Sequence, residues 1–241
     1  MSKKPFIISI LGNDGSGKFT QATMLKEKLE KDNKKVKMIS FPNYESDIGK
    51  SIKRDLMTKA NSEDMRDLIL LINKFAMDRV ITLENINMED YDFIIFDRYT
   101  SSNVLHMGAK IINLNKDKSK LDEELISCIT YILDKEHKDL SLPIPDLEFF
   151  LEVRPEVSYH NILNRYEGDM SKLDLNESLE SLKSVSEKQV TIIGKMLNYF
   201  KYKTIPYNLE FVHCSNKEKM FSKDKIHNEI LKILEWYFND K

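Results

Sequence analysis

The chain has 241 residues and almost balanced charge, with 37 lysines and arginines against 39 aspartates and glutamates, a formal net charge of −2. Hydrophobic residues make up 41% and charged residues 32%, which is typical of globular proteins and excludes a disordered or membrane-embedded chain. A large nucleic-acid interface requires a basic domain, so we expect no nucleic-acid polymer and no membrane as partner. Cys128 and Cys214 fall in apolar patterns and are expected to be reduced core residues, as in a cytoplasmic protein.

Short apolar runs alternate with longer amphipathic segments along the whole chain. Asn61-Ser62-Glu63 offers capping groups for a long helix that ends near Asn87, and the polar segment Tyr166–Asn176 is typical of a mobile loop. The alternation predicts an α/β fold, a parallel five-stranded sheet with helices on both faces, in a single domain over residues 1–241. Strands are expected at residues 6–11, 35–41, 91–97, 147–153 and 209–214, and other helices at 20–30, 47–56, 101–113, 121–138, 155–165, 177–202 and 225–238.

Three of the seven glycines lie within six positions, directly after the first predicted strand. The segment from Gly12 to Lys18, GNDGSGK, fits the pattern G-x-x-x-x-G-K of a Walker A phosphate loop, in the strand–loop–helix context that this loop requires. Glycines allow consecutive N–H groups to converge on a phosphate, the helix N-terminus favours negative charge, and the lysine adds a point charge. The residues expected to bind ATP are therefore Gly12, Asn13, Gly15, Ser16, Gly17, Lys18, Phe19 and Thr20.

One position departs from the phosphate-loop pattern. The serine or threonine that normally follows the lysine and binds Mg²⁺ is Phe19, and a phenyl ring cannot ligate a metal. Thr20 lies a helical step of about 100° further and is not expected to replace it. Asp97, which ends an apolar strand as a Walker B aspartate does, is the carboxylate best placed to help bind Mg²⁺. A role as a helix N-cap is the alternative for Asp97.

The chain resembles the thymidylate kinase family of P-loop nucleoside monophosphate kinases, which phosphorylate dTMP to dTDP with ATP. The resemblance extends over essentially the whole chain. It implies the fold of P-loop NTPases with a short mobile lid at about 154–176, ATP and Mg²⁺ as cofactors, and a possible homodimer through the helices at 62–87 and 101–114. It rests on the blocks GNDGSGKFTQ (12–21), FPNYESDIGK (41–50), FAMDR (75–79), DRYTSSN (97–103) and PDLEFFLEVRPEVS (145–158).

The resemblance assigns a nucleotide-recognition role to Phe75 and Arg79. Their i,i+4 spacing places both side chains on one helix face. In the family the aromatic ring stacks on thymine and the arginine hydrogen-bonds a carbonyl of the base. The alternative is that Phe75 belongs to the core and Arg79 to a surface ion pair.

In the next block, the resemblance implies that Arg98 binds the acceptor monophosphate and that Asp97 lies between metal and phosphates.

Further acceptor residues follow from the same resemblance. Ser102 and Asn103 are expected at the thymine edge, His106 near the sugar, and Asp14 at the 3′-hydroxyl of dTMP. His106 could instead be a core histidine, and Asp14 a structural loop carboxylate. Phe41, in the FPNY block, completes the expected substrate-binding set.

The arginine that stabilises the transferred phosphoryl group lies in the phosphate loop in one branch of the family, where this chain has Gly15. In the other branch the lid provides it, and Arg165, assisted by Lys172, is the candidate here; a solvated residue at a helix C-terminus is the alternative. Tyr44 stands where many members have an arginine for the acceptor phosphate.

Two other functions stay open. One is a kinase for another deoxynucleotide or for a deoxynucleoside, with Glu45 as the base for a deoxynucleoside. The other is a nucleotide-binding paralogue without useful turnover.

Overall fold

The computed structural model describes residues 4–58, 64–115, 117–173 and 175–239. Its centre is a five-stranded parallel sheet in the order β2-β3-β1-β4-β5. The strands are short and mostly apolar, as expected of strands buried on both faces. They comprise β1 (Phe6–Gly12), β2 (Val36–Ser40), β3 (Phe93–Asp97), β4 (Leu147–Glu152) and β5 (Leu209–His213). The parallel sheet predicted from the alternating pattern is thus confirmed.

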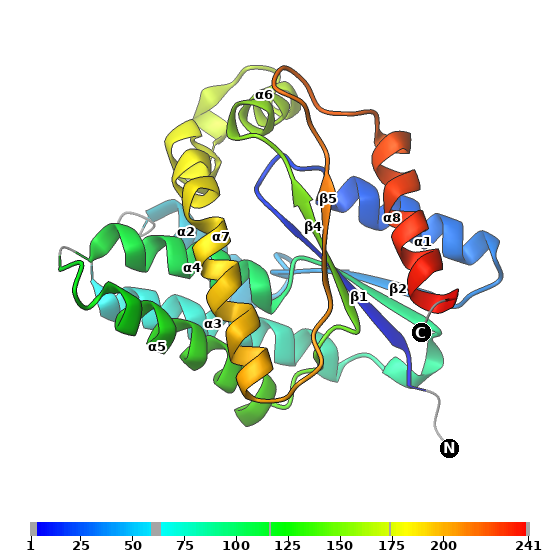
Figure 1. Cartoon of the computed structure of the whole chain (residues 1–241), viewed down its shortest axis with the longest axis horizontal. Helices are drawn as coiled ribbons and strands as arrows, with labels where there is room; N and C mark the ends of the chain where they lie inside the picture. The colour runs from blue at the N-terminus through cyan, green and yellow to red at the C-terminus, as the bar shows by residue number, and fades with distance from the viewer. Residues whose placement is uncertain (1–3, 59–63, 116, 174, 240–241) are drawn as a thin grey trace.

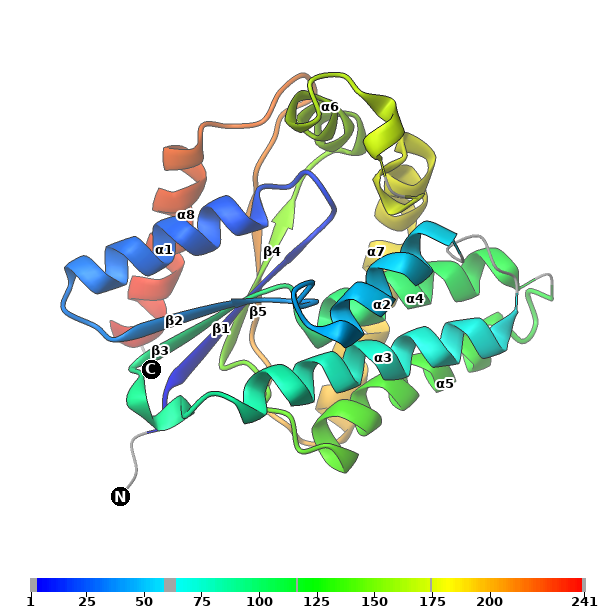
Figure 2. The ribbon, with the colours of Figure 1, turned by 180° about the vertical axis from the view of Figure 1, so that it is seen from behind.

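Helices cover both faces of the sheet (Figures 1 and 2). One face carries α1 (Lys18–Lys31) and α8 (Lys223–Asn239), and the other carries α3 (Met65–Glu84), α4 (Thr100–Leu114), α5 (Leu121–Leu133) and α7 (Leu179–Tyr202). Two shorter helices, α2 (Asp47–Thr58) and α6 (Pro155–Arg165), lie beyond the carboxyl ends of the strands. The chain therefore leaves its loops and two short helices at the edge where ligands bind in α/β sheets.

Alternating side chains of the central strand face two separate cores. Ile8 and Ile10 pack toward α1 and α8, together with Leu25 and Ile230, whereas Leu11 packs with the helices of the opposite face. Period-two alternation in one strand thus fixes both layers at once. In the described parts of the chain, no helix is long and apolar enough to cross a bilayer.

The structure corrects several predicted boundaries. The cap predicted at residues 61–63 lies outside the described residues, and the N-cap of α3 is Asp64, whose carboxylate accepts a hydrogen bond from the Arg66 N–H. The helix predicted at 121–138 is instead α5 followed by a π-helical turn over Asp134–Asp139. The segment predicted as a loop at 166–176 has a short 3₁₀ turn at Met170–Lys172, and a second one, Leu175–Glu177, begins at its end. The polar sequence that follows Leu133, DKEHKD, gave no sign of the change from an α-helix to a π-helical turn.

Both cysteines are free thiols in the structure. Cys214 is buried in the core beside α8, and Cys128 is half-buried against the core of the opposite face. Burial raises the pKa of the Cys128 thiol to about 11 and that of Cys214 to about 12. Both thiols therefore stay protonated near neutral pH, in agreement with their prediction as reduced core residues.

Candidate active site

The phosphate loop connects the end of β1 to the start of α1. Gly15 and Gly17 have φ values of +76° and +83°, the left-handed region in which glycine carries no steric penalty. The Lys18 ammonium folds back and donates to the Asn13 carbonyl oxygen at 2.7 Å. The first N–H groups of α1 have no partner within the helix, as at any helix N-terminus. The loop therefore presents backbone donors and one cation at a single point.

Gly15 also meets a packing constraint. A Cβ atom at this position would lie 2.3 Å from the Ser158 carbonyl oxygen of α6, and the Asn161 amide donates to the Gly15 carbonyl oxygen at 3.0 Å. The lid-side helix thus lies directly on the loop and excludes any side chain there. A phosphate-stabilising arginine cannot occupy position 15 unless α6 moves, so a cation must come from elsewhere.

Asp14 connects the phosphate loop to the end of β3. Its Oδ1 accepts a hydrogen bond from the Arg98 guanidinium, with which it forms an ion pair, and lies 3.7 Å from the Lys18 ammonium. Burial would raise the pKa of the Asp14 carboxyl, but the Arg98 and Lys18 cations outweigh it and hold this pKa well below its usual range. Burial and the Arg98 charge lower the pKa of Lys18 to about 7.

Arg98 has a strained backbone. Its φ of +66° is uncommon for a residue with a side chain and costs about 1–3 kcal/mol. Its N–H donates to the Ile10 carbonyl oxygen at 3.1 Å, which fixes the turn between β3 and α4 against β1. Burial alone would lower the pKa of Arg98, and the neighbouring Asp14 and Asp97 carboxylates raise it above its usual value. The guanidinium is therefore permanently charged.

Asp97 ends β3 opposite Ile10 of β1. The Ser40 hydroxyl donates to Asp97 Oδ2 at 3.3 Å, while Oδ1 is buried without a hydrogen-bond partner. Asp97 does not cap α4: the N-cap residue is Tyr99, which makes no side-chain cap. Phe19 is 63% exposed at the start of α1, and Thr20 is exposed beside it. Within the described segments, no group of three or more His, Cys, Asp or Glu residues could hold a metal ion by itself.

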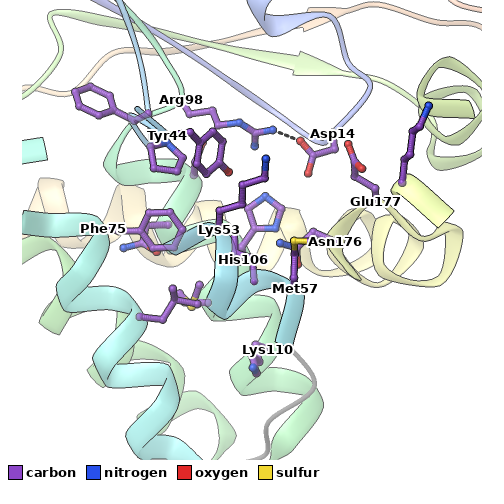
Figure 3. Close-up of a pocket in the computed structure, with 18 of the residues that line it drawn as sticks. Asp14, Tyr44, Lys53, Met57, Phe75, Arg98, His106, Lys110, Asn176 and Glu177 are labelled. Carbon is purple, nitrogen blue, oxygen red and sulfur yellow. Dashed lines mark hydrogen bonds and ion pairs between the residues drawn. The ribbon is translucent and has the colours of Figure 1, made fainter. Parts of the chain in front are cut away.

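A cavity of about 660 Å³ opens beside Asp14 at the carboxyl end of the sheet (Figure 3). Its walls come from elements far apart in the sequence: the phosphate loop, α2, α3, α4 and the segment after α6. The lining includes every residue that the sequence predicted for the acceptor nucleotide, namely Asp14, Phe41, Phe75, Arg79, Arg98, Ser102, Asn103 and His106. The fold thus gathers eight positions that span 93 residues of sequence.

The inner wall of the cavity is built around Arg79. Its guanidinium lies 5.8 Å from the ring centroids of Phe41 and Phe75 and 5.5 Å from that of Tyr99. One NH₂ group donates to the Glu136 carboxylate at 2.8 Å and the other to the Tyr99 carbonyl oxygen at 2.9 Å. Phe75 and Arg79 therefore share one helix face, as predicted. The ion pair offered as the alternative for Arg79 exists, but it is buried rather than on the surface.

The first turns of α4 bring polar groups into the cavity wall. The Ser102 hydroxyl and both side-chain polar atoms of Asn103 are buried without hydrogen-bond partners. Unpaired buried polar groups cost free energy, so such a cluster on a cavity wall indicates a ligand that completes it. Burial lowers the pKa of His106, which lies one turn further, to about 4, and its imidazole is neutral at pH 7.

The lid-side wall contains Arg165, Lys172 and a carboxylate that sequence analysis missed. Arg165 ends α6 and donates to Glu177 Oε1 at 3.3 Å, and the Tyr166 hydroxyl donates to the same carboxylate at 3.2 Å. The Arg165 charge also contributes to the lowered pKa of Lys18, so the two cations lie within electrostatic reach. Lys172 pairs with Asp169 at 3.6 Å.

Besides Glu177, two charged residues at or behind the cavity wall were not predicted. Lys53 extends from α2 toward the Arg98–Asp14 pair, and its ammonium lies 5.9 Å from the Tyr44 ring centroid (Figure 3). Glu136 and Glu177 hold the two arginines described above. The sequence did indicate that Glu136 is buried, because it continues the apolar stripe of Leu125, Ile129 and Ile132, and a buried carboxylate needs a partner. Lys53 and Glu177 had no such signal, because their importance depends on tertiary contacts.

Comparisons with known proteins agree with this geometry. A family model described as "Thymidylate kinase" matches residues 10–201. The chain is 30% identical over 195 residues to a probable thymidylate kinase of Saccharolobus solfataricus, covering 80% of this chain and 86% of the relative. It is 26% identical over 230 residues to the thymidylate kinase of Plasmodium falciparum, covering 95% and 90%. The solved structure of Candida albicans thymidylate kinase shares the fold, with a TM-score of 0.65 at 24% identity over 99% of this chain and 94% of that one. The chain belongs to the thymidylate kinase family.

Proposed function

We propose that this chain transfers the γ-phosphoryl group of ATP to the 5′-monophosphate of dTMP, giving dTDP and ADP. The observation that carries the proposal is the cavity: all eight predicted acceptor residues line it, and it opens beside the phosphate loop at Asp14. An oxygen of the acceptor monophosphate attacks the γ-phosphorus, and the bond to the β,γ-bridging oxygen breaks. No covalent enzyme intermediate is required, so catalysis depends on positioning and charge.

The donor side binds the triphosphate through the loop N–H groups and Lys18. Lys18 is neutral in part of the molecules near pH 7, and phosphate oxygens would favour its charged form. Arg165 would supply the cation that position 15 cannot hold, by leaving Glu177 as the lid closes over the phosphates. Such an arginine contributes about 10³–10⁵ to the rate in related phosphoryl transfers.

The donor groups fit Mg²⁺ held jointly by protein and nucleotide. Mg²⁺ usually takes one or two carboxylates together with phosphate oxygens and water, rather than a complete protein cage. Asp97 offers a buried oxygen without a partner at the end of β3, whereas Phe19 offers none. When bound, the ion would neutralise negative charge on the β- and γ-phosphate oxygens. Asp97 is the residue that we propose as its protein ligand.

The acceptor would bind with its phosphate at Arg98 and its base at Phe75 and Arg79. Both contacts that the structure shows for Asp14 fall on Oδ1, which leaves Oδ2 for the 3′-hydroxyl. Neutral His106 lies beside this position and can hydrogen-bond the sugar without adding charge. Ser102 and Asn103 would meet the polar edge of the base, satisfying their unpaired groups.

Lys53 would compensate for the missing arginine at position 44. Tyr44 provides an aromatic ring rather than a cation, and Lys53 places its ammonium over that ring. The contact that the structure shows for Lys53 among the described residues is with an aromatic ring, so its charge remains available to an anion. A lysine in this place can attract the acceptor phosphate as a point charge, without the bidentate geometry of arginine.

A homodimer would bury an apolar stripe on α3. Met65, Ile69, Met77 and Ile81 are spaced four or eight residues apart, on one helix face, and are each at least 40% exposed. The neighbouring helix α5 is joined to this surface by a hydrogen bond from the Tyr131 hydroxyl to the Asn73 side-chain oxygen Oδ1 at 3.0 Å. Most of α4 is buried within this chain, so α3 and α5 offer the more accessible apolar surface. We propose α3 and α5 as the dimer surface.

The test is an ADP-release assay with ATP, Mg²⁺ and a panel of acceptors. We expect turnover that is strongest with dTMP and absent with thymidine. Glu45, the base that a deoxynucleoside kinase would need, is exposed and lies outside the cavity lining. Turnover of thymidine would contradict the proposal, and binding of ATP and dTMP without any ADP release would establish a binding protein instead.

A further inference from the structure

A fully buried carboxylate lies behind the base side of the cavity. Glu136 belongs to the π-helical turn that follows α5, is 0% exposed, and is not part of the cavity lining. Its Oε1 accepts from the Arg79 guanidinium at 2.8 Å and its Oε2 accepts from the Thr100 hydroxyl at 2.6 Å. Both oxygens are therefore used to join α3 and the start of α4 to the turn after α5.

These contacts restrain the orientation of Arg79. One edge of the guanidinium is held by Glu136 and another by the Tyr99 carbonyl oxygen, while three aromatic rings surround it. A planar group with two fixed hydrogen bonds and aromatic neighbours has little freedom to rotate. Arg79 lines the cavity, so the direction of its remaining donors is set by a residue outside the cavity lining.

The charged groups on the base side and on the phosphate side of the cavity are paired differently. On the base side, Arg79 is paired one-to-one with Glu136. On the phosphate side, Arg98 and Lys18 share Asp14 and also interact with the Asp97 carboxylate, so neither cation has a carboxylate to itself. A neutralised guanidinium suits a neutral carbonyl of a pyrimidine, whereas an unpaired one would compete with Arg98 for the phosphate.

We propose that Glu136 is a positioning residue for base recognition, which holds Arg79 as a charge-neutralised donor toward the 4-carbonyl of the pyrimidine. This inference rests on the proposed function, because it assumes a pyrimidine monophosphate in the cavity. It further implies that Glu136 sets the orientation in which the nucleotide enters: base toward Arg79 and phosphate toward Arg98.

The test compares Glu136→Gln with the unaltered protein, using dTMP and 5-methyl-dCMP as acceptors. The second nucleotide keeps the methyl group and the sugar phosphate but replaces the 4-carbonyl acceptor by an amino donor. Loss of a charge-assisted hydrogen bond to Arg79 should raise the KM for dTMP roughly ten- to hundredfold. The KM for ATP should change less than about twofold, and the preference for dTMP over 5-methyl-dCMP should fall about tenfold or more.

Thr100→Val is the matched control. It removes the other hydrogen bond to Glu136 but leaves the Glu136–Arg79 pair in place. We expect it to lower the melting temperature without changing the base preference. Glu136→Asp keeps the charge with a shorter reach, so it should fold and give an intermediate base preference even if the glutamine variant is too unstable to purify.

Two outcomes would overturn the inference. Unchanged base preference in both Glu136 variants, with a lower melting temperature, would show a purely structural role. A parallel rise in the KM values for dTMP and ATP would show a general distortion of the site. Failure of the proposed function looks different, because the unaltered protein would then not phosphorylate dTMP at all, and no comparison between acceptors would arise.

Discussion

The donor and acceptor sides of the site are built in different ways. The phosphate loop is a continuous segment, Gly12 to Lys18, whose shape follows from glycine conformations and backbone hydrogen bonds. The acceptor cavity is assembled from five or more separate segments, and its arginines are held by distant carboxylates. Arg98 is paired with Asp14, 84 residues away, Arg79 with Glu136, 57 away, and Arg165 with Glu177, 12 away.

Because of this difference, we expect substitutions to affect the donor side and the acceptor side in different ways. The donor loop depends on backbone geometry and one cation, so a single side chain carries most of its charge. On the acceptor side each of the three arginines has a carboxylate partner that fixes its place and moderates its charge. Loss of one partner there should change the affinity or specificity for one ligand while leaving the other ligand's binding intact.

Lys18→Ala should have the largest effect. Lys18 is the cation of the phosphate loop, and its removal should lower kcat about 10³-fold or more. The melting temperature should stay nearly the same, because the side chain makes one hydrogen bond, to the Asn13 carbonyl, besides its approach to Asp14. Steady-state kinetics and thermal unfolding measure the two quantities. Lys26→Ala, on the exposed side of the same helix, is the control, and normal activity in Lys18→Ala would refute the phosphate-loop assignment.

Arg165→Ala should come next, with a loss in kcat of about 10²–10³ and little change in either KM. The reason is that Arg165 would contact the transferred group only as charge develops on it. Lys183→Ala provides the comparison, since Lys183 forms an exposed ion pair with Glu156 outside the cavity. Single-turnover rates separate the chemical step from product release. An unaltered single-turnover rate in Arg165→Ala would leave the solvated helix terminus as the correct interpretation.

Arg98→Ala tests the acceptor side directly. We expect the KM for dTMP to rise about 10²-fold, because a charge-assisted contact to the monophosphate is lost, while the KM for ATP changes less than about threefold. Arg54→Ala, an exposed position on α2, controls for nonspecific loss of positive charge. Equal increases for both nucleotides would move Arg98 out of the acceptor site and into the shared phosphate region.

The sequence was sufficient for features that depend on local pattern. The parallel five-stranded sheet was predicted from the alternating apolar runs, and the phosphate loop from its glycine spacing. Family resemblance then placed the acceptor residues, and the structure brings all of them to one cavity. The sequence did not show which charged residues of the site pair with one another. Nothing near Arg79 in the sequence points to Glu136, because the pair depends on how α5 ends in a π-helical turn. The packing of α6 on Gly15 is likewise a tertiary contact.

A pH experiment would sharpen the contrast, because the donor lysine is the titrating group. Burial and Arg98 lower the pKa of Lys18 to about 7 in the free protein, so the ammonium is charged below this pH and increasingly neutral above it. Bound phosphates favour the charged form, so ATP affinity should fall about tenfold between pH 6 and 8, with uptake of protons at pH 8. Calorimetry in buffers of different ionisation enthalpy measures the uptake. Lys18→Arg, charged throughout, corrects for titration of ATP, and equal uptake by both proteins would rule out Lys18 as the source.

Phe19→Thr should have the smallest effect and concerns the weakest point of the donor side. The Phe19 ring is 63% exposed, so its replacement should cost little stability, and a hydroxyl at this position supplies the Mg²⁺ ligand that the loop lacks. We expect the free Mg²⁺ concentration for half-maximal activity to fall about two- to fivefold, with less than a twofold change at saturating Mg²⁺. Phe19→Ala removes the ring without adding an oxygen and should leave the Mg²⁺ dependence unchanged. If both variants shift it equally, the ring obstructs the site rather than merely failing to bind the ion, and Asp97 with the phosphates is then a sufficient set of ligands.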